Sequence, residues 1–185
     1  MTTPPASTPV YKAFYKNSVY VQLDPVEIYV AAACGRKTWK ESQDGKHHEY
    51  FQQKEDGPTG EMIQMLGDLA VWSVAKYLDR YPMGFRTYKG PDLSGNIEVR
   101  LIGVEWYGLR VYTKDIERSK LVVGVVIPKG KERMPHRIAG WIPAAEAGRE
   151  EWIMNPGDRE RPFYGVPQSE LRHINTLPLP SRKRE

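Results

Sequence analysis

The sequence predicts an α+β fold in which a central mixed, mostly antiparallel sheet is packed by helices. Three observations predict it. Two long segments in the first 80 residues carry apolar residues at helical spacing. Several shorter segments after residue 84 carry the alternating or continuous apolar runs of strands, and a short helical segment follows them. Helices that come first and strands that come second favour this class over alternating βαβ units.

The two predicted helices are indicated by different features of the sequence. Asp24-Pro25 is a good helix start, with a capping carboxylate followed by proline at the first helical position. The following VEIYVAAAC places its apolar residues on one face, and Gly35 either ends this helix or is tolerated inside it. The second helix is expected over residues 59–78, which carry a broad apolar face, and Pro82 and Gly84 end it.

The predicted strands are GFRTYK, NIEVRLIGV, YGLRVYT, KLVVGVVIP and HRIAGWIP, between residues 84 and 143. Turn-like segments separate the first four, which indicates antiparallel hairpins in a β-meander. Residues 11–22 are a further candidate for an edge strand. A short helix is expected in AAEAGREEW (residues 144–152), and another near Pro167.

The chain of 185 residues is expected to form one domain. Residues 1–10 are rich in Pro, Thr and Ser and predict a disordered N-terminus. Residues 11–174 predict a single domain, and residues 175–185 predict a flexible basic tail. We find no internal repeat and no second domain boundary.

Composition excludes several classes of protein. The longest apolar stretch, LVVGVVIP, is far shorter than the roughly 20 residues that cross a bilayer, and the N-terminus lacks the pattern of a secretory signal. The single cysteine, Cys34, cannot form an internal disulfide, which suits a reducing compartment. We therefore expect a cytoplasmic protein without membrane contact. The sequence has no P-loop and no dinucleotide glycine fingerprint, so no nucleotide cofactor is expected.

The segment GPDLSGNIEVR (residues 90–100) carries the most informative pattern. Side chains alternate along a strand, so Glu98 and Arg100 are expected on one face, about 6.5 to 7 Å apart. Asp92 would lie roughly 20 Å from Glu98 in a fully extended chain. The turn-prone residues 93–96 can bring the two carboxylates together.

Pro91-Asp92 followed by Glu98-Val99-Arg100 resembles the PD-(D/E)XK nuclease superfamily, and the wider pattern resembles its small phage-encoded members. A helix with Gly67-Asp68 precedes the motif. Gly140-Trp141-Ile142 and a segment from Tyr164 to Leu171 follow it. The resemblance covers about residues 60–174 and implies a restriction-endonuclease-like core, built from a helix followed by a β-meander.

The resemblance implies a Mg²⁺-dependent (or Mn²⁺-dependent) phosphodiesterase that acts on DNA, of the kind that phages use in recombination, replication or genome processing. Asp92 and Glu98 would bind the metal, with the carbonyl of Val99 as a further ligand and Asp68 reaching it through water. Such a protein would work in the host cytoplasm. It could associate with phage or host replication or recombination proteins, or form a homo-oligomer.

Arg100 stands where the superfamily usually has lysine. Arginine stays protonated, so it cannot act as a general base, but it can orient and neutralise a phosphate. Whether the chain is an enzyme is therefore open, and the alternative is a catalytically impaired adaptor of the same fold that binds nucleic acid or protein. A plainer interpretation of Glu98 and Arg100 is a solvated strand face with an ion pair to Arg110 or Glu105.

The net charge of +4 is compatible with a polyanionic partner but does not require one. The residues expected to contact nucleic acid outside the motif are Arg36, Lys37 and Lys40, on one helix, and Arg110, on a strand. The tryptophans Trp72, Trp106, Trp141 and Trp152 are expected in the core more than as stacking platforms for bases.

Overall fold

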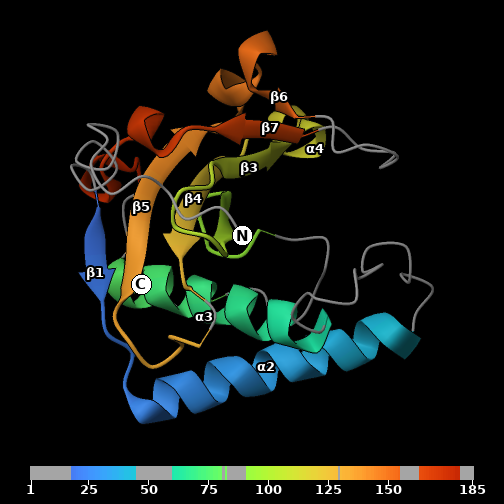
Figure 1. Cartoon of the computed structure of the whole chain (residues 1–185), viewed down its shortest axis with the longest axis vertical. Coiled ribbons are helices and arrows are strands. Elements are labelled where there is room, and N and C mark those ends of the chain that lie inside the picture. The colour runs from blue at the N-terminus through green and yellow to red at the C-terminus, as the bar shows by residue number, and fades with distance from the viewer. Residues whose placement is uncertain are drawn as a thin grey trace, which may run out of the picture.

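The computed structural model describes residues 18–44, 60–80, 82, 91–128, 130–154 and 163–179. Within these residues the chain forms three α-helices and seven strands, so the predicted α+β class is confirmed. The strands form a four-stranded mixed sheet in the order β1-β5-β4-β2 and a three-stranded antiparallel sheet in the order β3-β7-β6 (Figure 1). Their bounds are β1 Val19–Val21, β2 Ile97–Ile102, β3 Leu109–Tyr112, β4 Leu121–Val126, β5 His136–Pro143, β6 Ile153–Met154 and β7 Phe163–Val166.

The central strands do not form the predicted β-meander. β2 pairs parallel with β4, in a register that runs from Ile97 opposite Leu121 to Ile102 opposite Val126. Parallel neighbours need a crossover connection, and β3 together with the short helix α4 (Thr113–Glu117) provides it. β3 leaves the mixed sheet and pairs with β7. The expected strand over residues 84–89 lies outside the described residues.

The helix α2 (Pro25–Asp44) starts where the sequence predicts. The Asp24 carboxylate accepts hydrogen bonds from the backbone N–H groups of Val26 and Glu27, at 2.8 and 2.9 Å. Glu27 accepts in return from the Asp24 N–H at 2.7 Å, which completes a reciprocal cap. Lys76 of α3 (Gly60–Tyr77) also donates to Glu27, at 2.6 Å, and so ties the end of α3 to the start of α2.

Gly35 lies inside α2 and does not end it. A Cβ atom at this position would stand 2.6 Å from the Cα atom of Met65 on α3. The helix therefore keeps a glycine in its interior, despite the cost of about 1 kcal/mol relative to alanine, because the backbone of α3 passes too close for a side chain. Figure 1 shows the resulting layers: α2 outermost, then α3, then the sheets.

Two apolar cores lie on opposite faces of the mixed sheet. The first is between the sheet and α3, and the second is between the sheet and β3, β7 and the turn over residues 144–147. Alternation along β2 assigns Ile97 and Val99 to the first core and Ile102 to the second. Glu98 and Arg100 therefore point to the side of the second core, between the two sheets.

The C-terminal part of the chain is packed further than expected. Residues 174–176 form a 3₁₀ turn, and Leu177 is buried in the first core. The indole N–H of Trp141 donates to the carbonyl of His173 and to the hydroxyl of Thr176, both at 3.1 Å. The first residues of the segment expected to be a flexible tail are thus part of the folded domain, and residues 180–185 lie outside the described part.

The two short helices predicted after the strands are 3₁₀ turns instead, over Ala144–Ala147, Glu150–Trp152 and Gln168–Glu170. Their lengths of three or four residues are typical of 3₁₀ structure, whose hydrogen bonds are poorer than those of an α-helix. Among the helices in the described ranges, none combines the length and the apolar character that crossing a bilayer requires.

Candidate functional site

The turn between Asp92 and β2 brings the predicted motif together. Leu93 and Ile97 form an antiparallel bridge with backbone hydrogen bonds of 3.2 and 3.4 Å, which closes a three-residue turn. Gly95 (φ 88°) and Asn96 (φ 60°) take left-handed conformations, which these two residue types tolerate best. The segment SGN was predicted to be this turn, and the structure confirms it.

Asp92 lies along the edge of β2 that faces away from β4. Its carboxylate oxygen Oδ2 accepts a hydrogen bond from the backbone N–H of Val99 at 2.8 Å. In a strand, the N–H and C=O of one residue point to the same side. The carbonyl of Val99 is therefore directed to the edge where the Asp92 carboxylate lies, as a shared role in metal binding requires.

Glu98 and Arg100 lie on the same face of β2, as predicted, but that face is not solvated. Glu98 is only 8% exposed. One of its oxygens, Oε1, contacts the Arg100 guanidinium at 2.8 Å, and the other accepts a hydrogen bond from the ammonium of Lys120. The plainer interpretation, a solvated face with an ion pair to Arg110 or Glu105, does not describe this face, because alternation along β2 turns Glu98 toward the second core.

Asp115 completes this cluster from α4. It is fully buried, and its two carboxylate oxygens each accept from Arg100 at 3.1 Å. One of them also accepts from the backbone N–H of Tyr112 at 3.0 Å, and Lys120 lies 4.0 Å from the other. Asp92, Glu98, Arg100, Asp115 and Lys120 are together called the charge cluster below.

Within the charge cluster, the Asp92 carboxylate lies in an unfavourable electrostatic environment. Burial and then the negative charge of Glu98 raise the pKa of Asp92 to about 7. The hydrogen bond from Val99 and the charges of Arg100 and Lys120 act in the opposite direction but do not cancel the increase. Burial also opposes the charge on Arg100, but Glu98 and Asp115 outweigh it and raise the pKa of this guanidinium, which stays protonated.

Lys120 and Asp115 are the site residues that sequence reasoning missed. Lys120 is 5% exposed, immediately before β4, and the parallel pairing of β4 with β2 brings it to Glu98. A lysine at the start of a predicted strand is ordinarily a solvated residue, so nothing in the local pattern indicated its burial. The one available signal was Arg100 itself, an arginine at the position where the motif that the sequence resembles has lysine.

Asp68, by contrast, is not brought into the charge cluster. It lies on α3, where its carboxylate accepts a hydrogen bond from Gln64 at 3.3 Å. Burial raises the pKa of Asp68 to about 6. Its charge acts on Cys34 of α2, where burial and then Asp68 raise the pKa of the thiol. The structure thus associates Asp68 with the side of α3 that faces α2.

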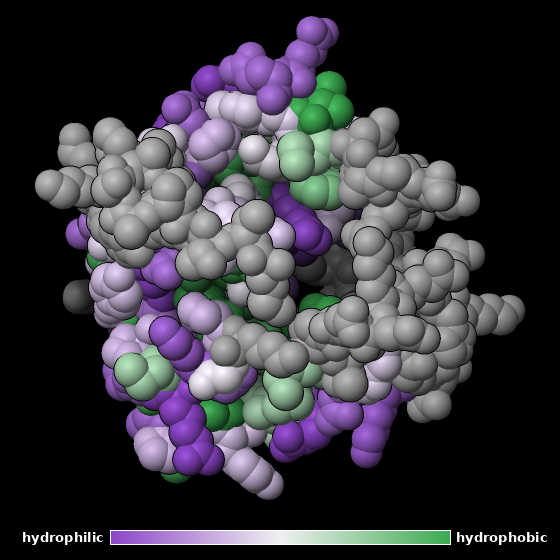
Figure 2. All heavy atoms as spheres, in the orientation of Figure 1, coloured by the Kyte–Doolittle hydropathy of each residue, from purple (hydrophilic) through white to green (hydrophobic). Residues whose placement is uncertain are grey.

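The cations expected to contact nucleic acid are divided between two places. Arg36, Lys37 and Lys40 line a shallow hollow on α2, together with Glu41. Over α2, at the bottom of the view, hydrophilic and hydrophobic side chains are interspersed (Figure 2). Since α3 separates α2 from the sheets (Figure 1), these cations are not next to the charge cluster. Arg110, on β3, is exposed and lies two residues from Tyr112, which contacts Arg100.

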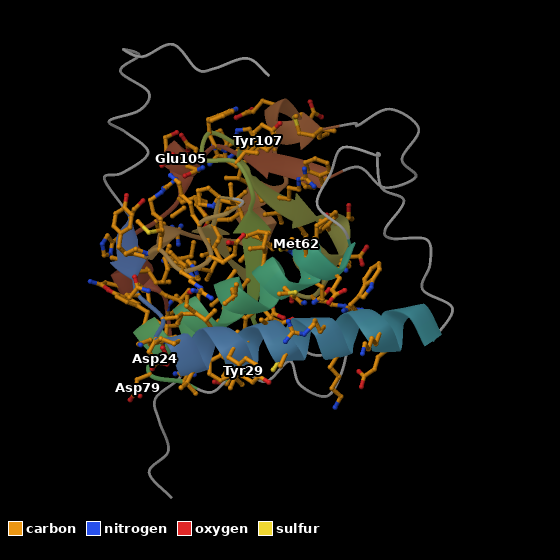
Figure 3. All side chains as sticks on the ribbon, turned by 60° about the horizontal axis from the view of Figure 1, so that its bottom comes forward. Asp24, Tyr29, Met62, Asp79, Glu105 and Tyr107 are labelled. Carbon is orange, nitrogen blue, oxygen red and sulfur yellow. The ribbon has the colours of Figure 1, made fainter. Side chains whose placement is uncertain are left out.

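Of the four tryptophans expected in the core, three lie in or against it and one does not. Trp141 and Trp152 are buried and Trp72 packs against the first core, but Trp106 is 45% exposed. It lies in the loop between β2 and β3 beside the exposed Tyr107. Figure 3 shows Glu105 and Tyr107 of this loop at the opposite end of the molecule from Tyr29 of α2.

The residues of the charge cluster fit a divalent cation in part. Asp92 and the carbonyl of Val99 are oxygen ligands of the type that Mg²⁺ prefers, and a cation beside Asp92 would relieve its repulsion with Glu98. Glu98, however, already uses both oxygens for Arg100 and Lys120. Within the described ranges, no three His, Cys, Asp or Glu side chains are grouped so that they could hold a metal.

Comparisons with known proteins identify no relative. No family model, no curated protein and no solved structure matches the chain.

Proposed function

We propose that this protein is a metal-dependent phosphodiesterase that acts on DNA, of the PD-(D/E)XK type. One observation carries the proposal. The turn at residues 94–96 joins Asp92 to the backbone of β2 beside Glu98, and the burial of Asp92 and then the charge of Glu98 raise the pKa of Asp92 to about 7. Two carboxylates that repel each other at one strand edge are a common arrangement for holding a divalent cation.

In this proposal Asp92, Glu98 and the carbonyl of Val99 hold Mg²⁺ or Mn²⁺, which when bound supplies an activated water and neutralises charge on the scissile phosphate. To hold a metal, Glu98 would have to give up one of its two cationic partners. Lys120 is the better candidate to be released, because Arg100 remains held by both oxygens of Asp115. The released ammonium is then available to the phosphate, which gives Lys120 the role that lysine has in the superfamily motif.

The test is cleavage of labelled single-stranded, double-stranded and branched DNA in the presence of Mg²⁺ or Mn²⁺. We expect cleavage that EDTA abolishes and that falls by at least about a hundredfold in Asp92→Asn and Glu98→Gln, as is typical when a metal ligand or charge-stabilising group is lost. Glu146→Gln is the matched control, because Glu146 also pairs with an arginine, Arg172, at 2.7 Å, but on the surface. Absence of cleavage by the folded wild-type protein on all three substrates refutes the enzymatic proposal.

A second function has its own supporting observation. Both Glu98 oxygens are occupied by cations of the chain itself, so the charge cluster is nearly neutral without a metal. This favours a non-enzymatic adaptor that keeps the fold and binds nucleic acid or protein. The adaptor predicts that DNA binding survives EDTA and is little changed by Glu98→Gln in a folded variant, with no cleavage under any condition.

A further inference from the structure

The outer face of the three-stranded sheet is lined by aromatic and cationic side chains. Alternation along β3 places Leu109 and Val111 in the second core, and leaves Arg110 and Tyr112 on the other side. On the neighbouring strand β7, Phe163 pairs with Tyr112 across the ladder. Met154 of β6 lies opposite Phe163 and is 52% exposed. This face is turned away from both apolar cores.

The aromatic rings and cations on this face form a continuous row. The Arg110 guanidinium lies 5.1 Å from the centre of the Phe163 ring, and the Phe163 and Tyr112 rings are 6.1 Å apart. Lys114 lies 5.7 Å from the centre of the Tyr112 ring, and Arg100 lies 5.3 Å from it. Arg100 reaches the Tyr112 ring from between the two sheets and belongs to the charge cluster, so Tyr112 joins the outer face of the sheet to Glu98 and Asp115.

Two cations of this row, Arg110 and Lys114, differ from other arginines that stack on rings. Arg149 lies over Trp152 and Arg172 over Trp141, and both also pair with glutamates. Among the ion pairs within the described residues, none involves Arg110 or Lys114. Exposed cations that have aromatic neighbours but no carboxylate partner suit a ligand that brings both planar groups and negative charge.

We propose that this face binds single-stranded DNA, with unpaired bases on the rings of Phe163 and Tyr112 and phosphates at Arg110 and Lys114. Base stacking on aromatic side chains and cations along the backbone are the two interactions by which proteins hold single strands. A duplex offers phosphates but keeps the faces of its bases stacked inside, so it would gain only the charge contacts. Binding of the single strand does not depend on the proposed function. Only cleavage of the bound strand at Asp92 and Glu98 rests on that function.

The experiment is fluorescence anisotropy with a labelled oligothymidine of about 20 nucleotides, longer than the site of a single binding fold, in EDTA so that no cleavage occurs. Phe163→Leu keeps an apolar side chain and removes the ring. We expect it to weaken binding about fivefold or more, since stacking on an aromatic side chain contributes about 1 to 3 kcal/mol per base. Arg110→Gln should make the slope of log K against log salt shallower by about 0.7, the value for one phosphate contact on a single strand.

Arg149→Gln is the matched control, because it removes an arginine that stacks on a ring elsewhere, and its affinity should equal that of the wild type. Melting temperatures establish that each variant is folded. If Phe163→Leu fails to fold, Arg110→Gln and Lys114→Gln replace it as the test, because both positions are exposed. Affinities that are unchanged in the row variants, or a duplex that binds as tightly as the single strand, overturn the inference. Binding that follows this pattern without any cleavage supports the surface while the proposed enzymatic function fails.

Discussion

The buried ammonium of Lys120 donates a hydrogen bond to the carboxylate of Glu98, although 22 positions separate the two residues in the chain. The parallel pairing of β2 with β4 makes this contact, because Lys120 immediately precedes β4. The contact changes how the Glu98-Val99-Arg100 motif is understood. Its arginine does not stand alone, because a lysine from the segment just before β4 contacts the same glutamate.

Glu98 and Lys120 are expected to be energetically coupled. Removing one partner of a buried ion pair leaves an uncompensated charge, so Glu98→Gln and Lys120→Met should each lower the free energy of unfolding by about 3 kcal/mol. The double variant should lose at least about 1 kcal/mol less than the sum of the two single losses. Urea denaturation of the four proteins measures this coupling. Strictly additive losses would show that the two side chains do not form a pair in solution.

Asp92 is expected to make the stability of the domain fall as the pH rises. Its pKa is about 7 in the folded protein, above the ordinary value of 3.8, so the unfolded chain gives up this proton first. The contribution of Asp92 to stability is complete below about pH 4 and is lost as the pH rises to about 7. Asp92→Asn, which can still accept from the Val99 N–H, should therefore be more stable than the wild type at pH 8, by on the order of 1 kcal/mol.

Denaturation between pH 4 and 8 tests this prediction, and the difference should shrink toward zero at the acid end. Asp24→Asn is the control with the opposite sign, because the N–H of Glu27 lowers the pKa of Asp24. Its loss of stability should be nearly constant between pH 4 and 8 and disappear only on further acidification. Parallel pH profiles for Asp92→Asn and the wild type would contradict the perturbed carboxyl.

Asn96 is expected to be important for the position of Lys120. Its side-chain amide donates to the carbonyls of Arg118 and Ser119, at 2.7 and 3.1 Å, and its own carbonyl accepts from the N–H of Leu121 at 3.0 Å. It also holds a left-handed backbone conformation, which costs about 1 to 2 kcal/mol for a residue with a Cβ atom.

Asn96→Ala should therefore be less stable than Asn96→Gly by about 1 kcal/mol, because both lose the amide and only alanine is strained. Chemical denaturation of the two variants compares them directly. Equal stability, or a more stable alanine variant, would show that residue 96 is not held at positive φ.

Arg100→Lys introduces the residue that the PD-(D/E)XK motif has at this position, but it is expected to be harmful. The guanidinium reaches Glu98 at 2.8 Å and both oxygens of Asp115 at 3.1 Å, and one ammonium cannot reproduce these contacts. We expect a loss of about 2 kcal/mol in the free energy of unfolding, within the range for hydrogen bonds to charged groups, and no gain in cleavage rate. A faster enzyme would indicate that Lys120 does not supply the lysine of the site.

The local features of the fold followed from the sequence because they depend on neighbouring residues. The cap at Asp24, the turn at Gly95-Asn96 and the common face of Glu98 and Arg100 are set by one to a few residues each. Helix α3 begins within one residue of its predicted start because its apolar face is long and regular.

The pairing of the strands did not follow from the sequence. The turn signals between β2, β3 and β4 fit either hairpins or a crossover, and only long-range packing decides that β3 joins β7. The burial of Lys120 and Asp115 depends on that choice, so neither could be assigned to the site. The burial of Glu98 did not follow from the sequence for the same reason, because alternation gives the shared face but not what covers it.

The most direct test of the proposed metal site is the melting temperature of the protein with and without Mn²⁺, at pH 5.5 and at pH 8. A ligand that binds only the folded state raises the melting temperature, and a metal that competes with a proton on Asp92 should do so more at pH 8. We predict a Mn²⁺-dependent increase that is larger at pH 8, is absent in Asp92→Asn and is kept in Glu146→Gln. No increase for the wild type at either pH, or an increase that Asp92→Asn retains in full, would contradict a metal site at Asp92 and Glu98.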